Sequence, residues 1–220
     1  MIKPLLISCK LVFFLVMAGI ILPVGLHAQN TLEAGLSGGY SYYNGDIVPA
    51  TPFVMPKPAY GAVVRYNFGD RWTAKVTYTH AQVAGDTTKS KPAVQGLQNF
   101  TTTINDISAM GEFNFMKYST GSKKYNFTPY ITAGAGFFLF NTEDIDTTVK
   151  SHNFAAIFGL GFKYSLSKRF GLSAEWRMHK TFTDMLDGQE GNSGTKDWFG
   201  VANVSITYKI GWGKEGACKY

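Results

Sequence analysis

The chain has 220 residues and a formal net charge of +6, and its charged residues make up only 16% of the total. Ordinary soluble proteins hold roughly 25% charged residues, whereas this chain is 45% hydrophobic and 15% aromatic. The small basic excess and the two cysteines exclude a disulfide-rich scaffold and argue against a nucleic-acid-binding protein.

Residues 1–28 are predicted to be a secretory signal peptide that is not part of the fold. Two lysines precede the apolar run 11–26, and Leu26-His27-Ala28 resembles a small-x-small cleavage site. A membrane-spanning anchor is the alternative, but the run is short for one. Without these two lysines, 19 of the 21 basic residues remain against 15 acidic ones, so residues 29–220 carry +4. They are expected to form one domain, with Cys218 as its single cysteine.

Apolar and polar residues alternate along the chain, and the pattern is clearest at the two ends of this domain. In the segment 198–210 every second residue is apolar or small, and most residues between them are polar. The segment 32–43 repeats the pattern. Such alternation predicts strands with one apolar and one polar face. The first and last strands are therefore expected to pair and to close the sheet into a barrel.

Six further segments between these two show the same period of two. In chain order the expected strands are 32–43, 59–68, 72–83, 102–115, 127–140, 153–165, 170–182 and 198–210. Their connections alternate between long and short: 44–58, 69–71, 84–100, 117–126, 141–152, 165–169 and 183–195. An even number of strands with this alternation is typical of outer-membrane barrels, whose short turns and termini are periplasmic and whose long loops are extracellular.

Alternation does not say which face points inward, so a soluble lipocalin-type barrel is the alternative. The polar face is rich in Gly and Ser, which suits a narrow lumen better than a solvated exterior. Aromatic residues on the apolar face gather near the strand ends, as in membrane girdles. At the short-turn end these are Phe68, Trp72, Phe115, Phe127, Tyr164, Phe170 and Tyr208, and at the long-loop end Tyr42, Tyr60, Tyr78, Phe137, Phe154 and Trp198. The predicted fold is therefore an all-β, eight-stranded antiparallel transmembrane barrel in the outer membrane of a Gram-negative cell.

The polar face also carries long side chains of both charges. Because an isolated buried charge is costly, these residues are expected to pair inside the lumen. The predicted lumen charge network consists of Glu33, Arg65, Lys75, Glu112, Lys163, Glu175 and Arg177. A barrel of eight strands encloses just enough space for its own side chains, so we expect no open channel.

Three stretches resemble one family of barrel proteins. They are EAGLSGGYSYYNGDI (33–47), TPYITAGAGFFLFN (128–141) and FGLGFKYSLSKRFGLSAEWRMHKTFTDMLD (158–187), the last followed by Lys196-Asp197-Trp198. They resemble the PorG family, outer-membrane barrels of Bacteroidota associated with type IX secretion. His179 and Met185 stand where the family leads us to expect Arg and Tyr. The resemblance implies a structural component of a protein secretion machine that docks periplasmic ring proteins.

A second reading is a general structural or surface-binding barrel of the OmpA/OmpX kind, which acts through its extracellular loops. Two candidate surfaces correspond to these readings. The candidate outer-loop motif is Asn44, Gly45, Asp46, Thr183, Asp184 and Asp187. The candidate periplasmic partner turns contain Asp70, Arg71, Lys117, Lys123, Lys124, Lys168 and Arg169. Expected partners are outer-membrane lipids and lipopolysaccharide, together with periplasmic secretion-ring proteins.

No enzymatic motif accompanies the barrel pattern. His179, near Thr181, Asp184 and Asp187, is the best constellation for catalysis, but no motif places a Ser beside it. Acidic loop residues could hold divalent cations directly or through lipopolysaccharide phosphates, yet no fixed ligand spacing supports a metal site. We therefore expect no enzyme, no cofactor, no metal and no nucleic-acid partner.

Overall fold

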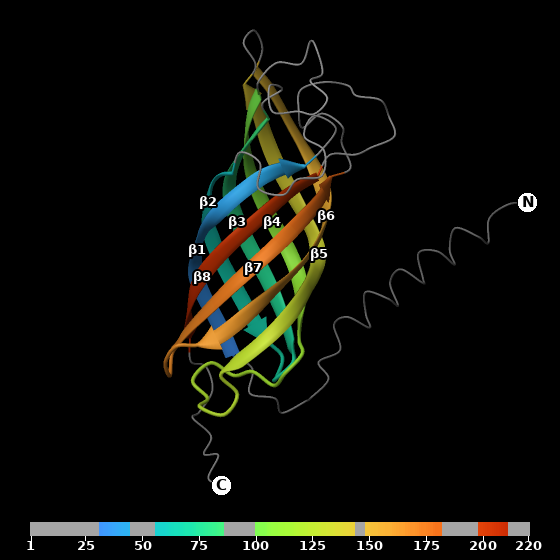
Figure 1. The fold of residues 1–220 in the computed structure, drawn as a ribbon. Helices are drawn as coiled ribbons and strands as arrows, with labels where there is room; N and C mark the ends of the chain where they lie inside the picture. The colour runs from blue at the N-terminus through green and yellow to red at the C-terminus, as the bar shows by residue number, and fades with distance from the viewer. Residues whose placement is uncertain (1–30, 45–55, 86–99, 144–147, 182–197, 211–220) are drawn as a thin grey trace, which may run out of the picture.

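The computed structural model describes residues 31–44, 56–85, 100–143, 148–181 and 198–210. These residues form eight antiparallel strands in one sheet, which closes because the first strand pairs with the last (Figure 1). The strands are β1 (Thr31–Asn44), β2 (Lys57–Asn67), β3 (Trp72–Gly85), β4 (Phe100–Asn114), β5 (Phe127–Glu143), β6 (Thr148–Ser165), β7 (Phe170–Thr181) and β8 (Trp198–Ile210). Within the described ranges, no helix has the length and apolar character needed to cross a membrane.

The closing pair β1–β8 runs along the whole length of both strands. Leu32 lies opposite Ile210 and Asn44 lies opposite Trp198. The turns 68–71, 115–126 and 166–169 therefore lie at the end of the barrel where β1 begins and β8 ends (Figure 1). The predicted eight-stranded antiparallel barrel, with its first and last strands paired, is confirmed.

The hairpin of β5 and β6 is longer than the alternation predicted. Its ladder continues to the pair Glu143 and Thr148, so the predicted connection 141–152 is wrong and only 144–147 lies outside the described strands. The added segments are polar, so they carry no apolar alternation that would mark them as strands. Pairing with each other still satisfies their backbone N–H and C=O groups.

The barrel is apolar outside and polar inside. Leu36, Trp72 and Phe154 are each at least 60% exposed on the outer face. Lys75 and Glu112 are at most 1% exposed in the lumen. Because strand residues alternate between faces, this polarity follows from the sequence pattern. An apolar exterior of this extent matches hydrocarbon rather than water.

The predicted aromatic girdles are mostly on the outer surface. All seven aromatics named for the short-turn end are exposed. At the long-loop end Tyr60, Tyr78 and Phe154 are exposed, and Phe137 and Trp198 are half-buried.

Tyr42 is the exception, since only 1% of it is exposed. Its ring lies over Gly200 of β8, where a Cβ would overlap the ring atoms. Its hydroxyl accepts a hydrogen bond from Trp176 Nε1 of β7 at 2.7 Å and donates to Met178 Sδ at 3.4 Å. Tyr42 lies on the outer face beside Trp176 and Met178, as predicted, but the expectation that it faces lipid was wrong, because its ring lies flat over Gly200 and joins β1 to β7 across β8.

Candidate functional site

Glu112 of β4 is the centre of a buried ionic cluster in the lumen. Its Oε1 lies 2.8 Å from Lys75 Nζ of β3 and 3.3 Å from Arg65 Nε of β2. Its Oε2 forms an ion pair with Lys163 of β6. Glu112 itself is completely buried. One carboxylate thus joins three cations from three other strands.

Glu175 of β7 is the second acid of this cluster. It forms an ion pair with Lys75, which bridges the two acids, and its Oε1 lies 3.0 Å from Arg177 Nε. Tyr130 OH donates to Glu175 Oε2 at 2.6 Å. The Tyr130 ring also lies 4.8 Å from Lys163 Nζ and 5.6 Å from Lys75 Nζ, within the range of cation–π attraction. Tyr130 is therefore an integral part of the cluster that the sequence reasoning missed.

The buried charges of the described residues balance. Four cations (Arg65, Lys75, Lys163 and Arg177) face four carboxylates (Glu33, Asp106, Glu112 and Glu175). All seven side chains of the predicted network are buried in the lumen. Buried ions are tolerable when they are paired and hydrogen-bonded. Glu112 and Glu175 meet that condition with the four cations, whereas Glu33 is held by hydrogen bonds alone and Asp106 Oδ1 has no hydrogen-bond partner among the described residues.

Glu33 lies apart from the other acids, at the short-turn end of the lumen. It forms no ion pair with any described residue; instead it accepts hydrogen bonds from Thr207 Oγ1 at 3.0 Å, Asn67 Nδ2 at 3.1 Å and Thr120 Oγ1 at 2.7 Å. Thr120 belongs to the turn between β4 and β5. This turn therefore folds inward beneath the barrel and closes the lumen at its short-turn end.

The same turn buries Tyr118, which is 5% exposed. Burial raises the pKa of the Tyr118 phenol from its ordinary value of 10.0 to about 12. Lys209 Nζ donates to the carbonyl of Thr120 at 3.1 Å and ties the turn to β8. Sequence reasoning treated this segment as an exposed connection. Its alternation is too short to reveal that Tyr118 and Thr120 point inward.

The long-loop half of the lumen is apolar. Its buried cluster consists of Ala59, Ala81, Val83, Ile104, Phe138, Phe140, Ala155, Phe199 and Val201. The Phe138 ring lies 5.8 Å from Phe140 and 5.9 Å from Phe199, measured between centroids. The lumen is thus filled by ionic side chains in one half and aromatic ones in the other.

His179 lies between these two halves and is 1% exposed. Its ring stacks on Phe199 at 4.2 Å, and its Nε2 lies 3.8 Å from Asp106 Oδ2. Ser108 donates to the same Asp106 oxygen at 2.5 Å. The expected neighbour Thr181 is buried on the same strand, whereas Asp184 and Asp187 lie outside the described residues. Among the described residues, Asp106 is the acid that the structure brings to His179.

Ser108, His179 and Asp106 are the residue types of a nucleophile, a base and an acid, but their hydrogen bonding does not suit catalysis. Ser108 donates to the Asp106 carboxylate rather than to the imidazole, so His179 is not placed to take its proton. Each of the three residues is at most 2% exposed. No group of three or more His, Cys, Asp or Glu among the described residues could hold a metal ion.

The cations predicted to face a periplasmic partner lie on the turns. Arg71, Lys117, Lys123, Lys124, Lys168 and Arg169 are all exposed, as is Asp70. Arg71 donates to the carbonyl of Phe115 at 3.0 Å, and Arg169 donates to Tyr208 OH at 2.9 Å. Of the predicted outer-loop motif, Asn44 is the last residue of β1; Gly45, Asp46, Thr183, Asp184 and Asp187 lie outside the described residues.

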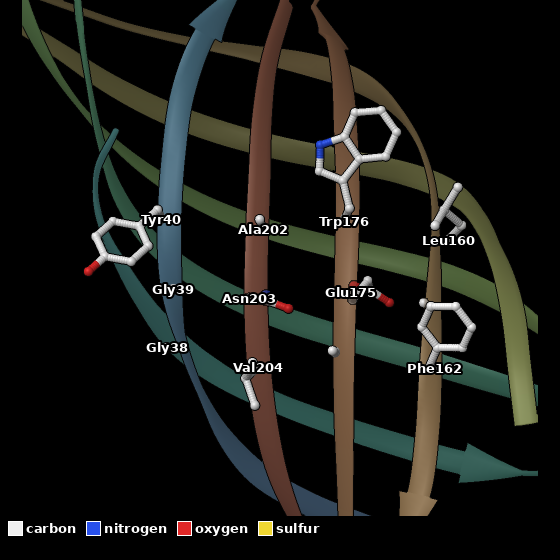
Figure 2. A pocket seen from close by; sticks show the side chains of 12 residues that line it. Gly38, Gly39, Tyr40, Leu160, Phe162, Glu175, Trp176, Ala202, Asn203 and Val204 are labelled. Atoms are coloured by element: carbon white, nitrogen blue, oxygen red, sulfur yellow. The ribbon is translucent and has the colours of Figure 1, made fainter. Parts of the chain in front are cut away.

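A shallow groove of about 480 Å³ lies on the outer surface across β1, β8, β7 and β6. In Figure 2 Tyr40, Trp176, Leu160 and Phe162 stand around a floor that includes Ala202. Glu175 borders the groove through its strand, but its carboxylate belongs to the lumen cluster. The groove is therefore part of the apolar exterior, and the Glu175 carboxylate does not enter it.

A closed eight-stranded barrel with an apolar exterior and an ionic lumen defines the class of small outer-membrane barrels. The fold is similar to the N-terminal β-barrel domain of OprF from Pseudomonas aeruginosa, with 14% identity, a TM-score of 0.51, and coverage of 83% of this chain and 98% of that one. It is also similar to Neisserial surface protein A (NspA), with 13% identity, a TM-score of 0.53, and coverage of 83% and 98%.

The chain belongs to the family described as "Domain of unknown function (DUF6089)", whose model matches residues 10–218. A comparison with curated protein sequences found no match.

Proposed function

We propose that this chain is an integral outer-membrane barrel that conducts no solutes, catalyses no reaction and acts by binding at its two ends. The observation that carries the proposal is the filled lumen inside an apolar exterior. Paired ions, the inward-folded turn and the aromatic cluster occupy the space through which a solute would pass. With its interior occupied and its sides facing lipid, the barrel has only its ends to offer to partners in water.

The absence of catalysis has its own support. Ser108, Asp106 and His179 are the best catalytic group among the described residues, and all three are sealed inside the barrel. A substrate would have to displace Phe199 from the His179 ring to reach them.

Conductance across a planar bilayer tests the closed lumen. The purified barrel is expected to give no current steps, because no water-filled path exists. A variant with Phe138→Ala, Phe140→Ala and Thr120→Ala removes side chains from both ends of the filling and serves as the control for detecting a pore. Steady current steps from the unaltered protein would refute the proposal.

A more specific role concerns the binding at the short-turn end. We propose that the exposed cations there dock periplasmic ring proteins of a type IX-like secretion machine. This proposal rests on the sequence resemblance and on the basic turns. The general reading, a structural or surface-binding barrel that acts through its outer loops and contacts lipopolysaccharide, has the support of the two similar solved barrels.

Two experiments separate the readings. Under the secretion reading, deleting the gene leaves secreted cargo unprocessed inside the cell, and Lys123→Glu with Lys124→Glu releases a periplasmic partner during affinity purification. Under the general reading both measurements stay unchanged, and shortening the outer loops alters surface binding instead. Normal secretion in the deletion strain would exclude the first reading.

A further inference from the structure

Three turns form a single rigid surface at the short-turn end of the barrel, which we call the turn platform: residues 68–71, 115–126 and 166–169. The backbone N–H of Tyr118 donates to the carbonyl of Asp70 at 3.1 Å, which joins the first two turns. Gly121 N–H donates to Ser165 Oγ at 2.8 Å, and Ser165 N–H donates to the carbonyl of Asn126 at 2.7 Å. Hydrogen bonds from main-chain N–H groups thus join the first turn to the second, and the second to Ser165 at the end of β6, directly before the third turn.

The turn platform carries the excess charge of the protein. It contains six cations (Arg71, Lys117, Lys123, Lys124, Lys168 and Arg169) and one acid (Asp70), which gives +5. Residues 29–220 carry +4 in total, with 19 basic residues against 15 acidic ones. The remainder of that region therefore carries −1, and the buried charges of the described lumen balance. The positive charge is concentrated on one end face.

Apolar side chains lie among these cations. Tyr125 is 38% exposed, and its ring lies 5.5 Å from Lys124 Nζ and 6.0 Å from Lys117 Nζ. Met116 and Leu166 are exposed by 44% and 52%. Aromatic and methionine side chains are enriched in protein-binding surfaces, so the platform offers more than solvating charge.

The position of the lysines favours a protein over lipid headgroups. Arg71 and Arg169 lie at the rim, where they bind Phe115 and Tyr208 next to the aromatic girdle. Lys117, Lys123 and Lys124 instead belong to the turn that folds under the mouth of the lumen, because Thr120 in the same turn binds Glu33. Lipid headgroups surround a barrel at its rim, whereas the mouth faces the aqueous compartment.

We propose that the turn platform binds an acidic segment of a periplasmic protein. This inference rests on the proposed function, which places the short turns in the periplasm. Complementary charge would steer the segment to the platform and fix its orientation. The hydrogen bonds between the turns hold the cations in place beforehand, so little ordering is required on binding.

Fluorescence anisotropy tests the proposal directly. The full chain is folded into nanodiscs of zwitterionic phosphatidylcholine. A fluorescein-labelled peptide, in which glutamates alternate with serine repeats that contain phenylalanine, is then titrated in at low salt. Lys123→Glu with Lys124→Glu is expected to weaken binding about tenfold. Lys123→Gln with Lys124→Gln should give an intermediate loss, and added salt should weaken the unaltered protein most.

The matched control is Lys57→Glu with Lys180→Glu, which reverses two charges on strands β2 and β7 outside the platform. It is expected to bind the peptide like the unaltered protein. Heat-dependent gel mobility checks that every variant is a folded barrel, so a failure of the fold is told apart from a failure of binding.

Two results would overturn the proposal. One is a peptide that does not bind the unaltered protein, or that loses equal affinity in the control and in the platform variant. The other is binding to phosphatidylglycerol vesicles that depends on Lys123 and Lys124 while the peptide does not bind, which would assign the platform to lipid. The closed lumen would stand in either case, because conductance tests it separately.

Discussion

Replacing Glu112 with Gln is expected to destabilise the barrel strongly with little change in side-chain shape. Glu112 is completely buried and pairs with Arg65, Lys75 and Lys163. At an effective dielectric of about 20, one ion pair at roughly 4 Å gains about 4 kcal/mol. In the unaltered protein, much of the attraction between Glu112 and the three cations offsets the desolvation cost of burying those cations. When the carboxylate is lost, the attraction disappears but the desolvation cost remains. Removing one partner of a buried pair typically costs about 3–5 kcal/mol, which we expect for Glu112→Gln.

Urea unfolding in lipid vesicles, followed by tryptophan fluorescence, measures this loss as a change in the free energy of unfolding. The matched control is Asp70→Asn, the same chemical change at an exposed carboxylate in the turn platform. Surface substitutions usually stay within about 0.5 kcal/mol, so the control should unfold like the unaltered protein. If Glu112→Gln also stays within that range, water reaches the cluster and the reasoning about a dry ionic lumen fails.

Three further changes test other parts of the barrel. Gly39→Ala would place a Cβ against the Ala202 carbonyl and should abolish the heat-modifiable folded band, whereas Gly38→Ala, which has open space, should leave it unchanged. Tyr130→Phe removes the 2.6 Å hydrogen bond to Glu175 and should cost about 1.5–3 kcal/mol in urea unfolding. Because burial raises the pKa of Tyr118 to about 12, the fold favours the neutral phenol. The contribution of Tyr118 to the free energy of unfolding should be fully present below about pH 10 and should fall as the pH rises towards 12. The fall should be smaller in Tyr118→Phe, and an equal fall in both proteins would contradict the raised pKa of Tyr118.

The strands could be predicted because the barrel is apolar on one face along most of its length. The eighth strand was predicted with the bounds that the structure shows, Trp198–Ile210. Here the outer Val204 and Ile206 alternate with the inner Ser205 and Thr207, so the sequence pattern and the surroundings agree in this half of the strand. The acids and bases of the lumen could be predicted for the same reason, since charge on the inner face stands out against Gly and Ser.

The rest depended on contacts that a period of two does not encode. Phe138 and Phe140 point inward although they are as apolar as their outward neighbours Phe137 and Leu139, so the alternation disappears there. The inward turn around Thr120 depends on Glu33, which lies 87 residues away in sequence. Only the closed structure brings such partners together.

The contrast between the two halves of the lumen gives a reason for the ionic half. An apolar filling is often as stable as a buried ion cluster or more so, so stability alone does not account for the cluster. A strand that is apolar on both faces, as around Phe138, gives no preference for which face turns inward, and a slip of one residue exchanges the faces. Charges such as Lys75 and Glu112 cannot face hydrocarbon without a large cost, so they fix the register of β3 and β4. We therefore infer that the ionic half fixes the strand register of the barrel and that the aromatic half closes its lumen at the long-loop end.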